Sequence, residues 1–307
     1  MVVTDSPPPA TACLETLIDR LHARERLRVW SIVISAYGDA VVPRGGVLWL
    51  GALQALMARL RIEPGALRAA MSRLAADGWL NRDKRGRRSY YTLADAGRLS
   101  FALATQRIYA AGPVAWDGRW TICVAPEEAG EARDARRKAL RELGFGTLGP
   151  TVFCRPETEA APDAAAHLKG AVVFSAEAPA SEHLPPLTAA AWPLQEAATA
   201  YVELAGAFTP LLDSLRAGAT LDPLDAMAAR TLLIHDFRRV ALKDPLLPRP
   251  LLPETWPGGK AREMTAELYR LLLPASEAWL DACDGAPDGA LPRVAADFYA
   301  RFGGLKS

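Results

Sequence analysis

Apolar residues recur with helical spacing in three successive segments near the start of the chain. Residues 28–40 and 47–60 are apolar on most sides, which favours two helices near the centre of a domain. In the third segment, residues 63–78, Pro64 suits the first turn of a helix and Gly78 suits its end. The spacing i, i+3, i+4, i+7 and i+8 predicts that one stripe of this helix is buried: Leu67, Ala70, Met71, Leu74 and Ala75.

A basic segment follows these helices. Residues 81–93, NRDKRGRRSYYTL, contain five Lys or Arg residues and one acidic residue. Two short strand-like runs flank the Arg85–Gly86 pair, which is typical of a β-hairpin turn, and residues 94–110 predict a further helix. Three helices and a basic hairpin in this order predict a winged helix-turn-helix, a fold that binds DNA.

The middle of the chain changes to an alternating pattern. Strand-like segments at 119–126, 151–156 and 170–177 alternate with helix-like segments at 131–144 and 161–169. Such alternation predicts a small α/β or α+β unit.

Helical patterns dominate the last third of the chain. After a linker-like stretch at 177–186, apolar stripes and capping residues predict long helices at 194–215, 222–242 and 258–283. Pro274 is expected to break or kink the last of these helices.

Composition and charge narrow the classes of partner. The chain has 307 residues, 36 of them basic and 35 acidic, and this near balance excludes a globally basic, histone-like binder. Any affinity for nucleic acid must then come from an asymmetric patch. The four cysteines are scattered without a CxxC pair, so neither a zinc site nor a disulfide framework is expected. With no apolar signal segment and no run long enough to span a bilayer, the protein is expected to be cytoplasmic, without membrane contact.

The third helix and the hairpin supply the candidate DNA-binding residues. Opposite its buried stripe, the helix carries small residues together with Arg68 and Arg73, so it is slim enough for a major groove about 12 Å wide. The two arginines suit guanine edges or phosphates, and Ser72 can donate to either. The hairpin residues expected to reach phosphates or the minor groove are Arg82, Lys84, Arg85, Arg87, Arg88 and, through its hydroxyl, Tyr90. The alternative is an ordinary solvated basic face.

The segment VPRGG at 42–46 permits two interpretations. Arg44 precedes the second helix, whose amide end can meet a DNA phosphate with Arg44 assisting. Alternatively, the segment is a turn that needs Gly45 and Gly46 for backbone freedom.

Five blocks of sequence between residue 26 and residue 285 occur in the order of one known family. They are SIVISAYGDAVVPRGGVLWLGALQALM, LRAAMSRLAADGWL, GRRSYYTLADAGR, WDGRW and the long, highly specific LLIHDFRRVALKDPLLPRPLLPETWPG. With these blocks the chain resembles the PaaX family, which comprises repressors of bacterial phenylacetate-degradation operons.

The resemblance implies a multidomain α+β architecture and a mode of action. The expected parts are a flexible N-terminal tail and lead-in at 1–25, a winged helix-turn-helix domain at 26–110, a ferredoxin-like domain similar to Cas2 nucleases at 111–185, and a helical effector or dimerisation domain at 186–307. Family members work as homodimers on palindromic double-stranded operators and are released by phenylacetyl-CoA. The resemblance therefore implies operator DNA, a second copy and an acyl-CoA as partners.

A metal-dependent nuclease is the alternative from another class. Cas2-like nucleases bind a divalent metal with an Asp at the end of their first strand, where this sequence has Ala125 and Pro126. Asp117 lies before that strand, and Glu127 and Glu128 lie just after it. Since no carboxylate at the strand end anchors the metal, we expect no catalytic or metal-binding residues and no enzyme activity. The domain is then a dimerisation or spacer element.

An acyl-CoA effector needs clustered cations beside an apolar pocket, because its head carries phosphates and its acyl end is apolar. His235, Arg238 and Arg239 fall at i, i+3 and i+4 on one face of a predicted helix. Lys243 lies one turn further on, and Trp256 is a candidate for an aromatic wall. Alternatively, the two arginines stabilise the C-terminal end of their helix and pair with acids.

Two further alternatives stay open. The chain is either a repressor that answers another acyl-CoA or aromatic acid, or a DNA-binding protein without a small-molecule effector. No cofactor is expected in any of these interpretations.

Overall fold

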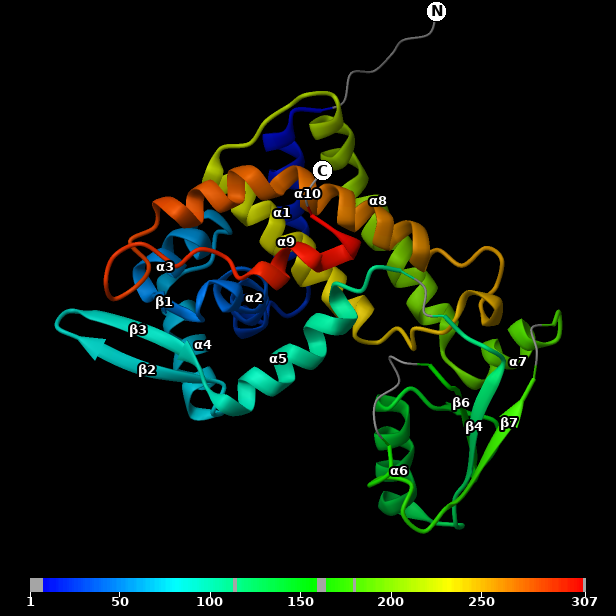
Figure 1. Ribbon diagram of the computed structural model, residues 1–307. Coiled ribbons are helices and arrows are strands. Elements are labelled where there is room, and N and C mark those ends of the chain that lie inside the picture. Colours follow the sequence, from blue (N-terminus) through cyan, green and yellow to red (C-terminus); the bar gives the residue numbers. More distant parts are fainter. Residues whose placement is uncertain (1–7, 113–114, 159–163, 179–180, 306–307) are drawn as a thin grey trace, which may run out of the picture. The chain divides into compact units, whose positions relative to one another are not determined.

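The computed structural model describes residues 8–112, 115–158, 164–178 and 181–305 (Figure 1). The chain divides into two compact units. The first unit consists of Met1–Ala111, Glu203–Leu242 and Lys260–Ser307, and the second of Gly112–Val202 and Lys243–Gly259. The predicted helical segment 186–307 therefore does not form a compact unit by itself, because its helices pack partly with the N-terminal residues and partly with the middle of the chain.

Helices make up most of the first unit. The N-terminal ones are α1 (Ala10–His22), α2 (Val29–Ala36), α3 (Leu50–Arg59), α4 (Pro64–Ala76) and α5 (Asp95–Ile108). The expectation of a flexible segment over 1–25 is wrong for α1, because Leu14, Ile18 and Leu21 are buried on one face of this helix. Just after α1, Arg24 pairs with Asp236 of another helix at 2.5 Å, in a partly buried contact.

A three-stranded antiparallel sheet completes the N-terminal part. Its strands β1 (Val47–Trp49), β2 (Leu80–Arg85) and β3 (Arg88–Leu93) lie in the order β1-β3-β2. The predicted hairpin is confirmed, and Gly86 at its turn has a φ of 58°, which glycine adopts without strain. The helix predicted at 47–60 starts only at Leu50, because the first three residues pair with β3.

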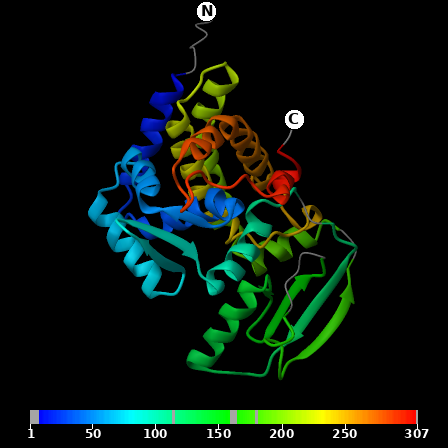
Figure 2. The ribbon, with the colours of Figure 1, turned by 60° about the vertical axis from the view of Figure 1, so that its left-hand side comes forward.

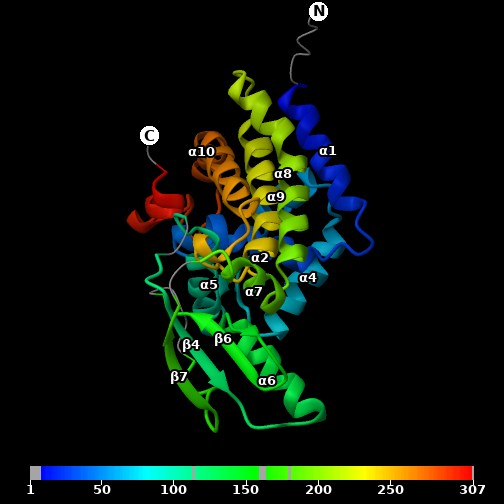
Figure 3. The same ribbon diagram turned by 90° about the vertical axis from the view of Figure 1, so that its right-hand side faces the viewer.

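Helix α9 (Pro223–Ala241) lies at the centre of the first unit. It contacts α1, α2, α3 and α5, and it is buried on nearly all sides, including the fully buried Arg230 (Figures 1 and 3). Helices α8 (Leu194–Arg216) and α10 (Gly258–Ala282) also contribute to this unit. Helix α10 continues through Pro274, so the predicted break is wrong. No helix in the described part of the chain combines the length and the apolar composition needed to cross a membrane.

The second unit contains a four-stranded antiparallel sheet. Its elements are β4 (Arg119–Val124), α6 (Gly130–Glu142), β5 (Gly146–Thr147), β6 (Val152–Pro156), β7 (Val172–Glu177) and α7 (Leu184–Ala191). The strands lie in the order β5-β6-β4-β7. The helix predicted at 161–169 is wrong where the chain is described, since residues 165–170 form turns, while 161–163 lie outside the described residues. Sequence analysis also missed β5 and placed a linker where α7 begins.

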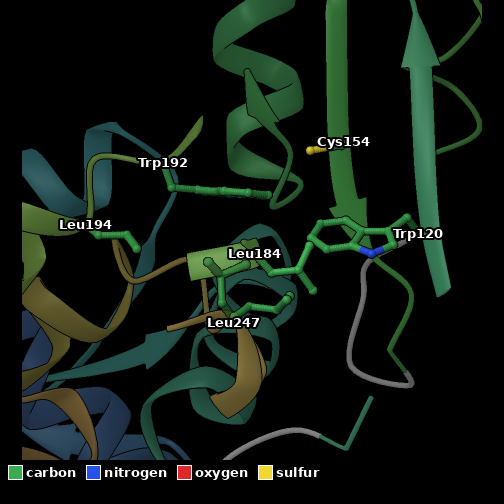
Figure 4. Close-up of a cluster of buried hydrophobic side chains, with 7 residues drawn as sticks. Trp120, Cys154, Leu184, Trp192, Leu194 and Leu247 are labelled. Carbon is green, nitrogen blue, oxygen red and sulfur yellow. The ribbon is translucent and has the colours of Figure 1, made fainter. Parts of the chain in front are cut away.

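Side chains alternate along each strand, so β4 and β6 carry packed residues on both faces of this sheet. On one face, Cys123 and Phe153 pack with Leu140 of α6. On the other face, Trp120 packs with Trp192 and with Leu247 of a later loop (Figure 4). Side chains from segments far apart in sequence thus tie α7 and residues 243–259 to the sheet.

Candidate functional site

Helix α4 presents a slim cationic face to solvent. Four of the five residues in the predicted stripe are buried, and Ala75 is half-buried: Leu67, Ala70, Met71 and Leu74 are between 0% and 7% exposed. Arg68, Ser72 and Arg73 are all exposed on the other side of the helix. The spacing of apolar residues therefore predicted correctly which side of α4 faces outward.

One of these arginines is held in place by two neighbours. The Arg73 side chain is 65% exposed, and its Nε lies 3.5 Å from the Asp77 carboxylate one turn further along α4. Its guanidinium also lies 5.9 Å from the centre of the Trp30 ring of α2. Both contacts are of the weak, solvent-exposed kind, so they orient the arginine without preventing it from exchanging Asp77 for another anion.

The hairpin distributes its cations over both faces of the sheet. Arg82 and Lys84 lie opposite Tyr91 and Ser89 of β3, so these four side chains share one face. That same face is buried nearer the base of the hairpin, where Tyr91 packs into the core. The Nη2 of Arg82 donates to the Ser89 hydroxyl at 3.0 Å, which extends the arginine along the hairpin.

On the other face of the hairpin, the cations lie beside acidic residues. Arg85 Nε donates to Asp83 at 2.8 Å, and Arg88 Nη1 donates to Asp284 at 2.6 Å. The Arg88 guanidinium also covers the Trp49 ring at 4.6 Å. Both arginines are about half-exposed, so these pairs are screened and contribute little to stability. Arg87, at the turn, is exposed.

Tyr90 differs from its predicted role. Its side chain is only 3% exposed, because its position on β3 turns it toward the inside of the unit. We therefore correct its assignment as a phosphate contact.

Arg44, another predicted DNA contact, is also buried. It is 3% exposed, and its Nη2 lies 2.5 Å from Glu277 and 2.8 Å from Asp281, both on α10. Gly45 and Gly46 have φ values of 87° and 76°, which only glycine adopts readily. These contacts correct the assignment of Arg44 to DNA, and they favour the alternative in which this segment is a tight turn.

A buried ionic cluster joins the N-terminal part of the first unit to its C-terminal part. Asp39, in the π-helical turn Tyr37–Val41 that extends α2, accepts from Arg230 at 2.6 Å and from Arg301 at 3.0 Å. The Tyr109 and Tyr269 hydroxyls donate to the same carboxylate at 2.6 and 2.8 Å. Burial alone would raise the pKa of Asp39, but the two guanidinium groups hold that pKa below its usual value.

Sequence analysis missed this cluster. Its charged members, Asp39, Arg230 and Arg301, are single charged residues in apolar helices or in the C-terminal segment, and more than 60 positions separate each from the next along the chain. The one available signal was an arginine in the middle of an apolar helix, since Arg230 has apolar or small neighbours on both sides.

The structure places the five candidate effector residues in different environments. His235 is 4% exposed, its Nδ1 lies 3.1 Å from the Ser35 hydroxyl, and burial lowers its pKa to about 4. A neutral, packed histidine is a core residue, so we correct its assignment to the effector. Arg239 is exposed on α9, while Lys243 and Trp256 belong to the second unit.

Arg238 borders an apolar cavity of about 410 Å³ within the first unit. The walls come from α2, α5 and α9, together with Trp79 in the connection between α4 and β2. Of the five candidate residues for the effector, Arg238 is the one that lines this cavity. Its position on one helical face was predictable from the sequence, but the cavity was not, since it needs α5 packed beside α2 and α9.

The end of strand β4 carries no carboxylate. The strand ends at Val124, and the following Ala125 is 6% exposed. Glu128 is paired with Arg136 of α6 at 2.6 Å, which lowers the pKa of the glutamate. Among the described residues, no group of three or more His, Cys, Asp or Glu side chains is placed to hold a metal ion.

A known relative indicates the class of protein. The chain is 35% identical over 284 residues to "Transcriptional repressor PaaX" of Escherichia coli (strain K12), and the match covers 90% of each chain. That relative is a regulator rather than an enzyme, which agrees with the prediction of a non-enzymatic protein. The cationic face of α4 and the basic hairpin are features of the same class.

Family models match three successive segments between residues 28 and 282. They are "PaaX-like protein" at residues 28–97, "PaaX protein central Cas2-like domain" at 113–183 and "PaaX-like protein C-terminal domain" at 192–282. The chain belongs to the PaaX family, as its sequence blocks predicted. Among solved structures, "Uncharacterized protein Rv0674 from Mycobacterium tuberculosis" is similar with a TM-score of 0.53 and 22% identity, covering 75% of this chain and 90% of that one. At that identity the likeness supports the fold alone.

Proposed function

We propose that the protein is a transcriptional repressor that binds double-stranded operator DNA through a winged helix-turn-helix formed by residues 26–110. The observation that carries this proposal is the exposed cationic face of α4 followed directly by a cationic hairpin. The element order α2-β1-α3-α4-β2-β3 and the sheet order β1-β3-β2 support it. The printed name of the Escherichia coli relative supports the same activity.

In this proposal, α4 enters the major groove and the hairpin contacts the DNA backbone. Arg68, Ser72 and Arg73 read base edges, because they occupy the slim outer face of the helix. Helix α4 packs against β2 (Figure 2). Arg82 and Lys84 share one face of β2 and contact phosphates beside α4. Arg85, Arg87 and Arg88 are the remaining hairpin contacts, with Arg85 and Arg88 exchanging Asp83 and Asp284 for phosphate.

The experiment that tests this proposal is selection of duplex DNA from a random pool by the full-length protein, followed by a gel-shift assay on the enriched sequence. We expect a palindromic site that is bound at least 1,000-fold more tightly than random duplex, as is typical of specific regulators. Enrichment of no sequence, or equal affinity for all duplexes, contradicts the proposal.

We further propose that the repressor controls phenylacetate catabolism genes and is released by phenylacetyl-CoA or a related acyl-CoA. Arg238 beside an apolar cavity, with Arg239 exposed on the same helix, supports a site for a ligand with an apolar end and an anionic head. Lys243 and Trp256 stay in the proposed effector set. Adding a panel of acyl-CoAs to the operator complex tests this proposal, and release by none of them contradicts it.

We also propose a cytoplasmic homodimer that forms through the edge strand of the second unit. Strand β7 lies at one edge of the ferredoxin-like sheet, and Val172, Val173 and Phe174 are 59%, 46% and 53% exposed. An edge strand with apolar side chains and free pairing capacity on its outer side is suited to antiparallel pairing with a second copy. Light scattering is expected to give a dimer for the wild type and a monomer for Val173→Lys. A dimer in both contradicts this interface.

A further inference from the structure

The loop between α10 and the 3-10 helix Ala296–Gly303 lies against the three-stranded sheet of the first unit. The Trp49 N–H of the edge strand β1 donates to the Gly285 carbonyl at 2.7 Å, so the loop borders the sheet on its open side. Directly afterwards, Ala286 and Gly289 form an antiparallel bridge, and the loop turns back on itself. A C-terminal segment therefore reaches the sheet that carries the basic hairpin.

Arg44 fixes both ends of this loop. Its Nη2 lies 2.5 Å from Glu277 and 2.8 Å from Asp281 on α10, ahead of the loop. Its Nη1 donates to the Pro292 carbonyl at 3.1 Å, on the far side of the loop. Because Arg44 is buried, its attraction to Glu277 is screened less than that of a surface pair. Residues 282–291 are thus held between two contacts of one side chain.

The fixed loop carries two acids that act on hairpin arginines. Asp284 accepts from Arg88 Nη1 at 2.6 Å, and both side chains are about half-exposed. Asp288 is exposed. The pKa of Arg85 is raised above its usual value, first by the hydrogen bond with Asp83 and also by the charge of Asp288. Each of these two arginines is therefore attracted to one acid of the C-terminal loop.

The two arginines share one face of the hairpin. Arg85 lies directly opposite Arg88 in the register of β2 and β3, so their side chains point to the same side. On the other face, Arg82 donates to the neutral Ser89 hydroxyl at 3.0 Å. The hairpin thus has one face whose arginines are held by carboxylates and one face whose arginine is held by a neutral group.

We propose that residues 283–289 form an autoinhibitory contact, in which Asp284 and Asp288 compete with the DNA backbone for Arg88 and Arg85. This inference rests on the proposed function, because the competition matters only where the hairpin meets DNA. Carboxylate and phosphate both bind guanidinium through charge-assisted hydrogen bonds, so a bound duplex has to displace the acids. Phosphate contacts carry no sequence information, and the loop therefore lowers the affinity for every duplex without changing which sequence is chosen.

The strength of this competition depends on the position of α10. Asp284 follows the end of α10 at Ala282 by two positions, so a shift of that helix end relative to β1 moves the acid away from Arg88. Both arginines are about half-exposed, and exposed pairs exchange partners at small cost. Each acid is therefore expected to change the affinity by a few-fold, without blocking DNA.

Fluorescence anisotropy on the full-length protein with a random duplex tests the competition. Asp284→Asn and Asp288→Asn should each bind about 2- to 5-fold more tightly than the wild type, which is the range of one exposed ion pair. Asp213→Asn is the matched control, because it removes the same charge from α8 of the same unit, where Asp213 is 48% exposed beside Arg216. It should bind like the wild type. Unchanged affinity in both loop variants, or an equal gain in Asp213→Asn, overturns the proposal.

A double-mutant cycle tests whether the gain passes through the pair of Asp284 and Arg88. In an Arg88→Ala background, Asp284→Asn removes an acid that no longer has its arginine. The gain in affinity should then fall to less than half of the gain in the wild-type background. Equal gains in the two backgrounds overturn the proposed contact.

Elution from a heparin column separates the loop contact from the repressor function, since heparin binds exposed cations without any duplex. Asp284→Asn should elute at a higher salt concentration than the wild type, and Asp213→Asn at the same concentration. Elution of Asp284→Asn at the wild-type position overturns the proposal. Later elution of this variant, together with a wild type that binds no duplex, contradicts the proposed repressor function and leaves the pairing of the loop with the hairpin cations intact.

Discussion

Two groups of arginine residues in the first unit have opposite surroundings. Arg230 and Arg301 are 0% and 6% exposed and share one buried carboxylate. Arg73 and Arg85 are 65% and 57% exposed beside single acids. Charge buried away from water must be neutralised where it is, while an exposed pair contributes only about 1 kcal/mol or less and exchanges partners easily. The first group therefore holds the framework together, and the second can exchange its acids for other anions, as the proposed DNA contacts require.

The largest expected effect is the loss of stability when the carboxylate shared by Arg230 and Arg301 is removed. In Asp39→Ala, two buried guanidinium groups lose their common counter-ion. Breaking a buried ion pair from one side costs roughly 3–5 kcal/mol, so the free energy of unfolding in urea should fall by about that amount. In Asp83→Ala, an exposed acid beside Arg85 is removed, and the loss should stay below about 1 kcal/mol. Equal losses in the two variants would show that the buried and the exposed arginines contribute equally to stability.

The next largest expected effect is the loss of stability at low pH that comes from the protonation of His235. Burial lowers its pKa to about 4, whereas a histidine in the unfolded chain titrates near 6.5. Between these values the unfolded state binds more protons than the folded state. Stability should therefore decrease as the pH falls from about 6.5 to about 4, by roughly 3 kcal/mol at the lower end.

His235→Asn and His183→Asn separate this effect from general acid sensitivity. The Asn at 235 does not titrate, so the loss of stability between pH 6.5 and about 4 should become shallower. His183 is exposed, with 87% of its side chain accessible, and its replacement should leave the pH dependence unchanged. Urea unfolding at a series of pH values measures both. A slope that is unaltered in His235→Asn contradicts the assignment of His235 as a neutral core residue.

The two groups also differ in how far the sequence predicted them. The basic hairpin and the outer face of α4 were predictable because their signals are local: adjacent charges around a glycine turn, and apolar spacing over one helix. Tyr90 lies in the hairpin but is buried. Arg44, in the turn before β1, is buried by contacts with a distant part of the chain, such as Glu277. No local pattern encodes those contacts, and the same holds for Asp39 and its partners.

Fold prediction shows the same limit. Helix α4 and strand β4 were predicted from their own periodicity, whereas Val47–Trp49 forms a strand only because β3 lies beside it. Helix α1 was missed because it follows a Pro-rich start, although Leu14, Leu17, Ile18 and Leu21 have helical spacing. The cavity depends on three helices far apart in the sequence, so the position of Arg238 on a helix face predicted a cation without predicting what lies next to it.

Substitutions on α4 are expected to have a moderate effect that is confined to DNA binding. Arg68→Ala and Arg73→Ala each remove an exposed cation from the proposed reading face, and a base contact of this kind contributes roughly 1–3 kcal/mol of discrimination. Fluorescence anisotropy should show about 10-fold weaker binding to the selected operator, with little change for random duplex. Arg216→Ala, on α8 and paired with Glu267, is the control. A loss of stability in Arg68→Ala or Arg73→Ala would instead assign these residues to the framework.

The smallest expected effect is a change in the salt dependence of DNA binding when hairpin cations are removed. Arg85→Ala combined with Arg87→Ala removes two proposed phosphate contacts, so affinity should fall for operator and random duplex alike. Each lost contact should flatten the plot of log K against log salt concentration by about 0.9, which gives a change of about 2 for the pair. Asp83→Asn acts in the opposite direction, because it releases Arg85 from its acidic neighbour and should strengthen binding to both duplexes. If the salt slope is the same in all three proteins, the hairpin is a solvated basic face and α4 binds DNA without it.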